Sequence, residues 1–132
     1  MKLSLAHISY LASHGFGRLA TVDAEGRPHV VPVGFRLDPD AGTIDVGGPF
    51  LPHSKKFSDV SSTGRAAFVV DDWGEPMLPR GIEVRGLAEI VSTGGTAIHE
   101  DFAPEIIRIT PDHVAAWGID DADRPPEGPA GS

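Results

Sequence analysis

A change to a period of two after Gly15, over six segments and clearest in the fifth, constrains the fold of this chain more than any other feature of its sequence. Such a period is typical of β-strands, whose successive side chains point to opposite faces. The predicted strands span 16–23, 27–37, 43–48, 65–72, 81–91 and 105–110. Turn sequences rich in Asp, Gly and Pro join the first three of them. The pattern predicts a mainly β fold, either a barrel or a sandwich.

Two short helices are expected beside these strands. Residues 3–14 carry apolar residues at helical spacing and are followed by Gly15, a helix stop. The segment after Ser54 has room for two or three helical turns between the third and fourth strands. Residues 73–80 contain two prolines and are predicted to form a loop.

Length and composition limit the classes of protein that the chain can belong to. Its 132 residues suit one domain, predicted at 1–121, followed by a disordered Pro/Gly-rich tail at 122–132. The net charge of -8 argues against nucleic-acid binding, which depends on Lys and Arg. No apolar run is long enough to span a membrane, and the amino terminus lacks the features of a secretory signal. With no cysteine to form disulfides, we expect a cytoplasmic protein.

The strand at 27–37 has an unusual edge. Pro28 and Pro32 have the same parity, so both missing N–H groups lie on one edge of the strand. That edge is expected to stay unpaired, which leaves main-chain groups open to a flat ligand. The alternative interpretation is an ordinary edge strand that prolines protect against aggregation.

The apolar pattern differs between the predicted strands, and this difference bears on assembly. In the strand at 81–91, Ile82, Val84, Ala88 and Ile90 share one face. The first and fourth strands are instead apolar on both faces, which a small monomer cannot cover alone. We therefore predict a homodimer.

Two adjacent lysines, Lys55 and Lys56, stand at the wrong end of a helix for cations. Ser54 is a plausible N-cap, which places both lysines in the first turn, where each costs about 0.3–1 kcal/mol when exposed. Helix N–H groups, a serine hydroxyl and two ammonium groups together suit a phosphate. The alternative is a pair of solvated surface lysines.

The sequence offers little support for other chemistry. Its six histidines show no close metal-ligand spacing, so no metal site is predicted. A G-x-S-x-G nucleophile motif is absent as well.

Several of these motifs together resemble the pyridoxamine 5′-phosphate oxidase-like split-barrel proteins. The resemblance covers about residues 5–120, and its most specific pieces are GRLAT, GRPHVVPVGF, SKKF, GRAAFVVDD and the terminal Trp117-Gly118. The branch it resembles most is that of the probable deazaflavin (coenzyme F-420) dependent oxidoreductases. The family implies a six-stranded antiparallel split β-barrel with short flanking helices. It also implies a homodimer with FMN or coenzyme F-420 at the subunit interface.

Carried over position by position, the resemblance implies a cofactor site. In that site the strand at residues 27–33 runs beside the ring of the cofactor, and residues 47–48 pass its ribityl chain. Residues 54–56 bind the phosphate. The loop after the fourth strand contributes contacts from the partner subunit. The implied cofactor-binding residues are Arg27, His29, Val31, Pro32, Val33, Gly47, Gly48, Ser54, Lys55, Lys56, Trp73 and Met77. His29 is the nearest candidate for a proton donor.

The resemblance implies an oxidoreductase that transfers a hydride between the cofactor and a small organic acceptor. The alternative is a non-catalytic protein that binds or carries a flavin, a deazaflavin or haem. The chain departs from the family pattern at Ser54, where many relatives carry arginine, and at Asp59, where an amide is common. It also lacks the longer carboxy-terminal region of true pyridoxamine phosphate oxidases, so that activity is not carried over.

Overall fold

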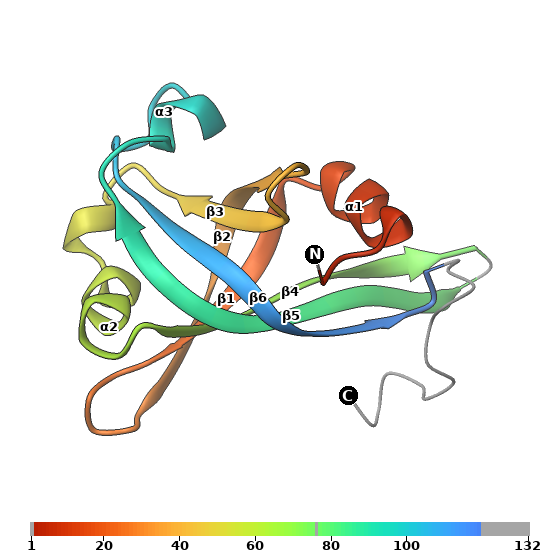
Figure 1. Ribbon diagram of the computed structural model, residues 1–132, viewed down its shortest axis with the longest axis horizontal. Coiled ribbons are helices and arrows are strands. Elements are labelled where there is room, and N and C mark those ends of the chain that lie inside the picture. The colour runs from red at the N-terminus through yellow and green to blue at the C-terminus, as the bar shows by residue number, and fades with distance from the viewer. Residues whose placement is uncertain (1, 76, 120–132) are drawn as a thin grey trace.

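A computed structural model shows a closed antiparallel β-barrel with short helices at its ends (Figure 1). The structure describes residues 2–75 and 77–119. The strands are β1 (Phe16–Val22), β2 (Pro28–Asp38), β3 (Thr43–Gly47), β4 (Arg65–Gly74), β5 (Leu78–Val91) and β6 (Ile106–Trp117). The helices are α1 (Leu5–Ala12), the 3-10 turn η1 (Leu51–His53), α2 (Lys55–Thr63) and α3 (Gly95–Ile98).

The strands close in the order β1-β2-β3-β6-β5-β4, and every neighbouring pair is antiparallel. This confirms the mainly β, six-stranded antiparallel split barrel and decides between the barrel and the sandwich. The expected tail at 122–132, and the end of the predicted domain at 121, lie outside the described residues.

The prediction of a loop at 73–80 is wrong. β4 continues to Gly74 and β5 begins at Leu78, so the two strands form a long hairpin that projects from the barrel (Figure 1). Pro79 stands opposite Trp73 within this ladder. Such a position is open to proline where the missing N–H need not face the partner strand.

The last strand is also longer than predicted, because it too continues past a proline. β6 runs to Trp117, well past the expected end at 110. The ladder continues past Pro111 through a β-bulge, in which Asp112 is the extra residue opposite Arg85 and Gly86. A Cβ on Gly86 would collide with the Thr110 carbonyl, so the bulge requires glycine there.

The barrel interior holds the core. Ile82, Val84 and Ala88 of β5 are buried and Ile90 packs against them, which confirms the predicted alternation in that strand. Leu11 of α1 is fully buried in the same cluster. These contacts fasten α1 to the barrel.

The helix predictions are largely confirmed. α1 starts at Leu5 rather than at residue 3 because Ser4 caps it, accepting a hydrogen bond from the His7 N–H at 3.1 Å. α2 starts directly after Ser54, as expected. η1 and α3 were not predicted, because three or four residues are too few to show a periodic pattern. No helix in the described part of the chain is long and apolar enough to cross a membrane.

A cluster of four polar side chains joins the end of α1 to the projecting end of the β4–β5 hairpin. Asp72 accepts hydrogen bonds from Tyr10 Oη at 2.9 Å and from Arg80 Nε at 2.6 Å, and it lies 3.1 Å from His14 Nε2. The hydrogen bonds from Arg80 hold the pKa of Asp72 well below its usual range. Burial, followed by the hydrogen bond to Asp72, raises the pKa of Tyr10.

Candidate functional site

The open edge predicted for β2 is present. Residues 28–34 pair with β1, with Pro28 opposite Val22 and Pro32 opposite Arg18. On its other edge β2 meets β3 only from Gly34 onward. The main chain of 28–33 therefore has one free edge within the described barrel, which is the split between its two halves.

The side chains along this edge show which groups a ligand can reach. Val33 is buried in the core and Val31 packs against that core. The side chains of both valines therefore pack in the barrel core, and only their main-chain groups are available to a ligand. Pro32 is exposed and lies on the outer face.

His29 has an unsatisfied polar atom. Its Nδ1 is buried and, among the described side chains, is the one buried side-chain nitrogen or oxygen without a hydrogen-bond partner. His29 stands opposite Thr21 of β1, beside the open edge. Because buried polar atoms are nearly always hydrogen-bonded, this atom can take a hydrogen bond from a water molecule or from a ligand group.

Ser54, Lys55 and Lys56 form the start of α2 (Figure 1), a helix that packs on β1 and β5 and approaches the β1–β2 turn through Lys55 and Asp23. The Ser54 hydroxyl accepts the Phe57 N–H at 3.3 Å and donates to the Leu51 carbonyl at 2.7 Å. The hydroxyl is thus engaged in capping. The remaining first-turn N–H groups of a helix have no acceptor within the helix and favour an anion.

The two lysines differ sharply. Lys55 Nζ lies 2.6 Å from Asp59 Oδ1 and 3.4 Å from Asp23 Oδ2. Lys56 is half-buried and, in the part of the chain that the structure describes, has no ion pair or hydrogen bond from its ammonium group. The hydrogen bond to Asp59 raises the pKa of Lys55, whereas burial lowers that of Lys56. Lys56 is the free cation of the pair.

Asp59 is buried, with 1% of its surface exposed. Its Oδ2 accepts a hydrogen bond from the Thr21 hydroxyl at 2.7 Å, and its Oδ1 accepts the one from Lys55. Burial alone would raise the pKa of Asp59, but these two hydrogen bonds outweigh it and hold that pKa below its usual value.

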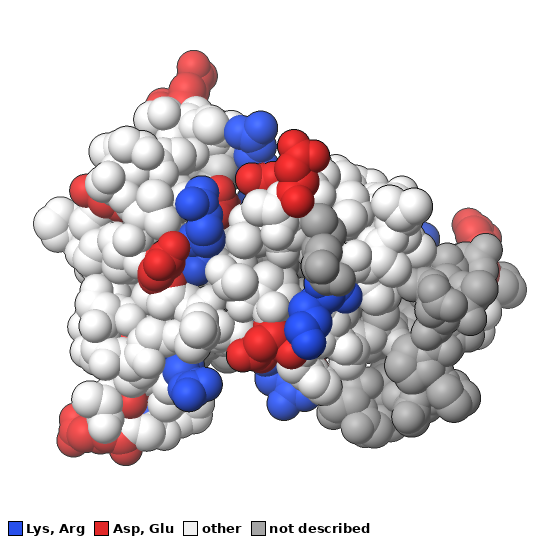
Figure 2. Space-filling view, viewed as in Figure 1, with Lys and Arg blue, Asp and Glu red and all other residues white. Residues whose placement is uncertain are grey.

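Arg27 lies in the β1–β2 turn, and its side chain is exposed. Its guanidinium bonds Asp23 at 2.9 Å and Glu25 at 2.7 Å. Figure 2 shows acidic atoms gathered at the tip of this hairpin. The side chain of Arg27 is therefore already neutralised locally.

The glycine pair at the end of β3 has two different environments. A Cβ on Gly47 would lie 2.7 Å from Phe102 Cδ2 and 3.0 Å from Ile98 Cδ1, whereas a Cβ on Gly48 would meet nothing within 4 Å. The lack of a side chain at Gly47 is thus explained by the packing of Phe102. Gly48 faces open space, as a position next to a ligand would.

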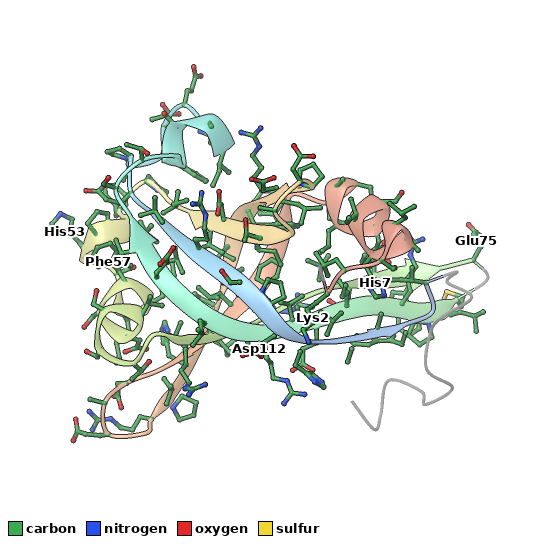
Figure 3. All side chains as sticks on the ribbon, viewed as in Figure 1. Lys2, His7, His53, Phe57, Glu75 and Asp112 are labelled. Carbon is green, nitrogen blue, oxygen red and sulfur yellow. The ribbon has the colours of Figure 1, made fainter. Side chains whose placement is uncertain are left out.

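Trp73 and Met77 lie at the far end of the molecule. Both are exposed, at 66% and 74%, on the projecting β4–β5 hairpin. Figure 3 labels Glu75 at the hairpin tip, and at the opposite end of the molecule it labels His53 of η1 and Phe57 of α2. One copy of the chain does not bring these two residues to the same place as the start of α2.

An open groove of about 470 Å³ crosses the outer face of the barrel. The groove is lined by small residues, among them Ala20, Ala67 and Gly86, and by Arg65 and Arg85. Asp112, labelled in Figure 3, borders it on β6.

Sequence reasoning missed three residues of this region: Thr21, Asp23 and Phe102. Asp23 was assigned only to a turn sequence. The ion pair between Lys55 and Asp59 was also not predicted, although their spacing of four residues within a helix was a signal for it. Nothing local in the sequence points to Thr21 or Phe102, which reach their positions through tertiary packing.

Comparison with known proteins agrees with this architecture. A family model described as pyridoxamine 5′-phosphate oxidase matches residues 6–118. The 5a,11a-dehydrotetracycline/5a,11a-dehydrooxytetracycline reductase of Streptomyces rimosus is 42% identical over 122 residues, which cover 91% of this chain and 86% of the reductase.

Two solved structures share the fold. An FAD-binding protein of Mesorhizobium loti has a TM-score of 0.65 at 21% identity, covering 86% of this chain and 94% of its own. The haem storage protein HutZ of Vibrio cholerae has a TM-score of 0.63 at 16% identity, covering 90% and 97%. The family model spans most of the chain and the reductase is similar over nearly its whole length, which confirms the resemblance: this chain belongs to the pyridoxamine 5′-phosphate oxidase family.

Proposed function

We propose that this protein is a reductase that holds FMN or the deazaflavin coenzyme F-420 and passes a hydride to a small organic acceptor. The name of the Streptomyces rimosus relative, a reductase, supports an oxidoreductase. Membership of the family and the fold shared with an FAD-binding protein support a flavin-type cofactor. The choice between FMN and coenzyme F-420 is left to experiment.

The observation that carries the proposal is the orphaned Nδ1 of His29 beside the open edge of β2. A buried ring nitrogen and a row of free main-chain groups provide directional hydrogen bonds of the kind that a flat heterocycle needs. A ligand bound there would satisfy atoms that the barrel leaves unpaired.

Each part of the chain would contribute one function to binding. The main chain of 28–33 would orient the ring, and Gly48 would leave room for the chain that connects ring and phosphate. The start of α2, with Lys56, would hold the phosphate. When bound, the cofactor supplies the hydride, and the protein positions it and excludes water. His29, as a titratable group beside the ring, is the candidate proton donor to the acceptor.

For the acceptor we propose a conjugated polycyclic compound. The supporting fact is the name of the relative, which acts on dehydrotetracyclines. The open edge of β2 and the exposed Pro32 beside it suit a flat molecule stacked on the cofactor ring.

We propose that the working form is a homodimer. Trp73 and Met77 are exposed on a hairpin far from the start of α2, so they can complete this site only from a second copy. The outer face of the barrel has a groove with small side chains at Ala20 and Ala67, which permit close approach of another barrel. Sedimentation equilibrium tests the assembly, and a stable monomer at micromolar concentration would contradict it.

The cofactor is tested by titrating the purified protein with FMN and with coenzyme F-420 while following absorbance and fluorescence. We expect saturable binding of at least one. Steady-state reduction of a dehydrotetracycline by the reduced cofactor then tests catalysis. Binding without turnover of any conjugated acceptor would favour the carrier alternative, and the absence of binding would contradict the proposal.

A further inference from the structure

Lys55 and Lys56 are neighbours in the sequence but occupy different electrostatic environments. Lys55 is bonded to Asp59 at 2.6 Å, and Asp23 lies 3.4 Å from the same ammonium. Two carboxylates thus surround one cation. Lys56 has no such partner among the described residues, and it is partly desolvated.

The ion pair between Lys55 and Asp59 does not follow from helix stability. A lysine four residues before an acid is the weaker order for such pairs, because it places the cation toward the positive end of the helix dipole. Asp59 is nevertheless 1% exposed and fixed by both of its oxygens, one to Lys55 and one to Thr21 of β1. Burying a carboxylate is costly unless it is paired. Because Thr21 of β1 fixes Asp59 inside the protein, and the buried Asp59 carboxylate needs a cation, the Lys55 ammonium group is held next to Asp59.

We propose that Asp59 is a positioning residue that withdraws Lys55 from the bound anion, so that Lys56 alone serves as the cation for the cofactor phosphate. This inference rests on the proposed function. It follows that the site offers one free positive side chain together with the helix start. It also follows that removing the Asp59 charge would loosen the hold on Lys55, which would keep the longer contact to Asp23 at 3.4 Å, and would make a second cation available to the anion.

The experiment compares FMN with riboflavin, which has the same ring and no phosphate. The ratio of the riboflavin Kd to the FMN Kd measures the contribution of the phosphate, and it cancels effects on ring binding. Lys55→Gln and Lys56→Gln form a matched pair, since both replace a cation with a neutral donor. Full-length protein and fluorescence titration at constant ionic strength are used throughout.

We expect Lys56→Gln to lower this ratio by roughly tenfold or more, the value of a charge-assisted hydrogen bond. Lys55→Gln should change it by less than about threefold, as expected for an ion that is already paired. Asp59→Asn should raise the ratio by about threefold or more, since it removes the shorter of the two ion pairs of Lys55 and leaves the 3.4 Å contact to Asp23. Adding Lys55→Gln to Asp59→Asn should remove that gain. A merely structural role for Asp59 predicts no gain.

Equal losses in the two glutamine variants, or an Asp59→Asn ratio at or below that of the wild type, would overturn the inference. Should Asp59→Asn not fold, as judged by circular dichroism, the two glutamine variants decide the question. If coenzyme F-420 rather than FMN is the ligand, the same ratio is taken between it and its phosphate-free ring compound. A wild type that binds none of these compounds contradicts the proposed function itself, and the inference with it.

Discussion

The hydroxyl of Tyr10 donates a hydrogen bond to Asp72 at 2.9 Å, and through this contact the first helix holds the projecting end of the β4–β5 hairpin. Asp72 and Arg80 are opposite each other in that hairpin and are joined by a bidentate ion pair. The direction in which the hairpin carries Trp73 and Met77 is therefore set by α1.

Replacing Asp72 with asparagine should lower the free energy of unfolding at pH 7 by about 1–2 kcal/mol, since one charge-assisted pair and its neighbours are weakened and partly screened by solvent. Because the folded-state pKa of Asp72 lies below its unfolded value, its stabilisation is present above about pH 4 and is lost as pH falls further. Urea unfolding between pH 2 and 7 measures both effects. Asp71→Asn is the matched control, because Asp71 pairs with Arg18 on an exposed surface. An equal loss in both variants would contradict the role given to Asp72.

Replacing Thr21 with valine should destabilise the fold by about 1–3 kcal/mol, because buried Asp59 then loses the donor to one of its oxygens. The loss should exceed that of Thr21→Ser, which keeps the hydroxyl. Since the depressed pKa of Asp59 depends partly on Thr21, the valine variant should lose stability at a higher pH on acidification than the wild type. Thermal unfolding from pH 3 to 7 tests this. Identical profiles for valine and serine variants would refute it.

Gly47→Ala should cost about 1–3 kcal/mol, because the new methyl group would press on Phe102 and Ile98. Gly48→Ala, one residue later, should change stability by no more than about 0.5 kcal/mol, since its Cβ meets nothing within 4 Å. Chemical denaturation of both variants gives the comparison. The same pair separates packing from binding: if Gly48 lies beside the cofactor, its variant should lose FMN affinity while remaining stable.

Met77→Gly should raise the free energy of unfolding by up to about 1 kcal/mol. Met77 has φ of 75°, in the left-handed region, which costs an L-residue about 1–2 kcal/mol, and the greater unfolded-state entropy of glycine offsets part of that gain. Met77→Leu keeps a Cβ and should show no such gain. If Met77 contacts a partner subunit, the glycine variant should also dissociate at a higher concentration than the wild type in sedimentation experiments.

The strands could be predicted from the sequence because their alternation is local, and so could the Ser54 cap. The ends of β4, β5 and β6 could not, because Pro76, Pro79 and Pro111 are typical of loops and only the ladder shows that β5 and β6 continue past the last two of them. Whether a proline interrupts a strand depends on the partner that faces its missing N–H group, which is a tertiary fact.

The candidate site shows the same division. The two prolines of β2 indicated the open edge from their parity alone, and the register confirms it. From the sequence alone, Lys55 and Lys56 could not be told apart, because both fall in the first turn of the same helix. The difference between them depends on Thr21, which is 38 positions from Asp59 along the chain. The unsatisfied Nδ1 of His29 depends likewise on what surrounds it in three dimensions.

The position of β6 between β3 and β5 has a consequence for the synthesis of this protein. On the ribosome, β1 to β5 emerge first. β4 can then pair with β1 and β5 with β4, while β3 and β5 each keep one free edge until β6 is made. The ring cannot close until Trp117, the last residue of β6, has left the exit tunnel. The nascent chain therefore passes through a stage in which the edges of β3 and β5 are open together, and its safe folding depends on how quickly the 12 residues of β6 follow.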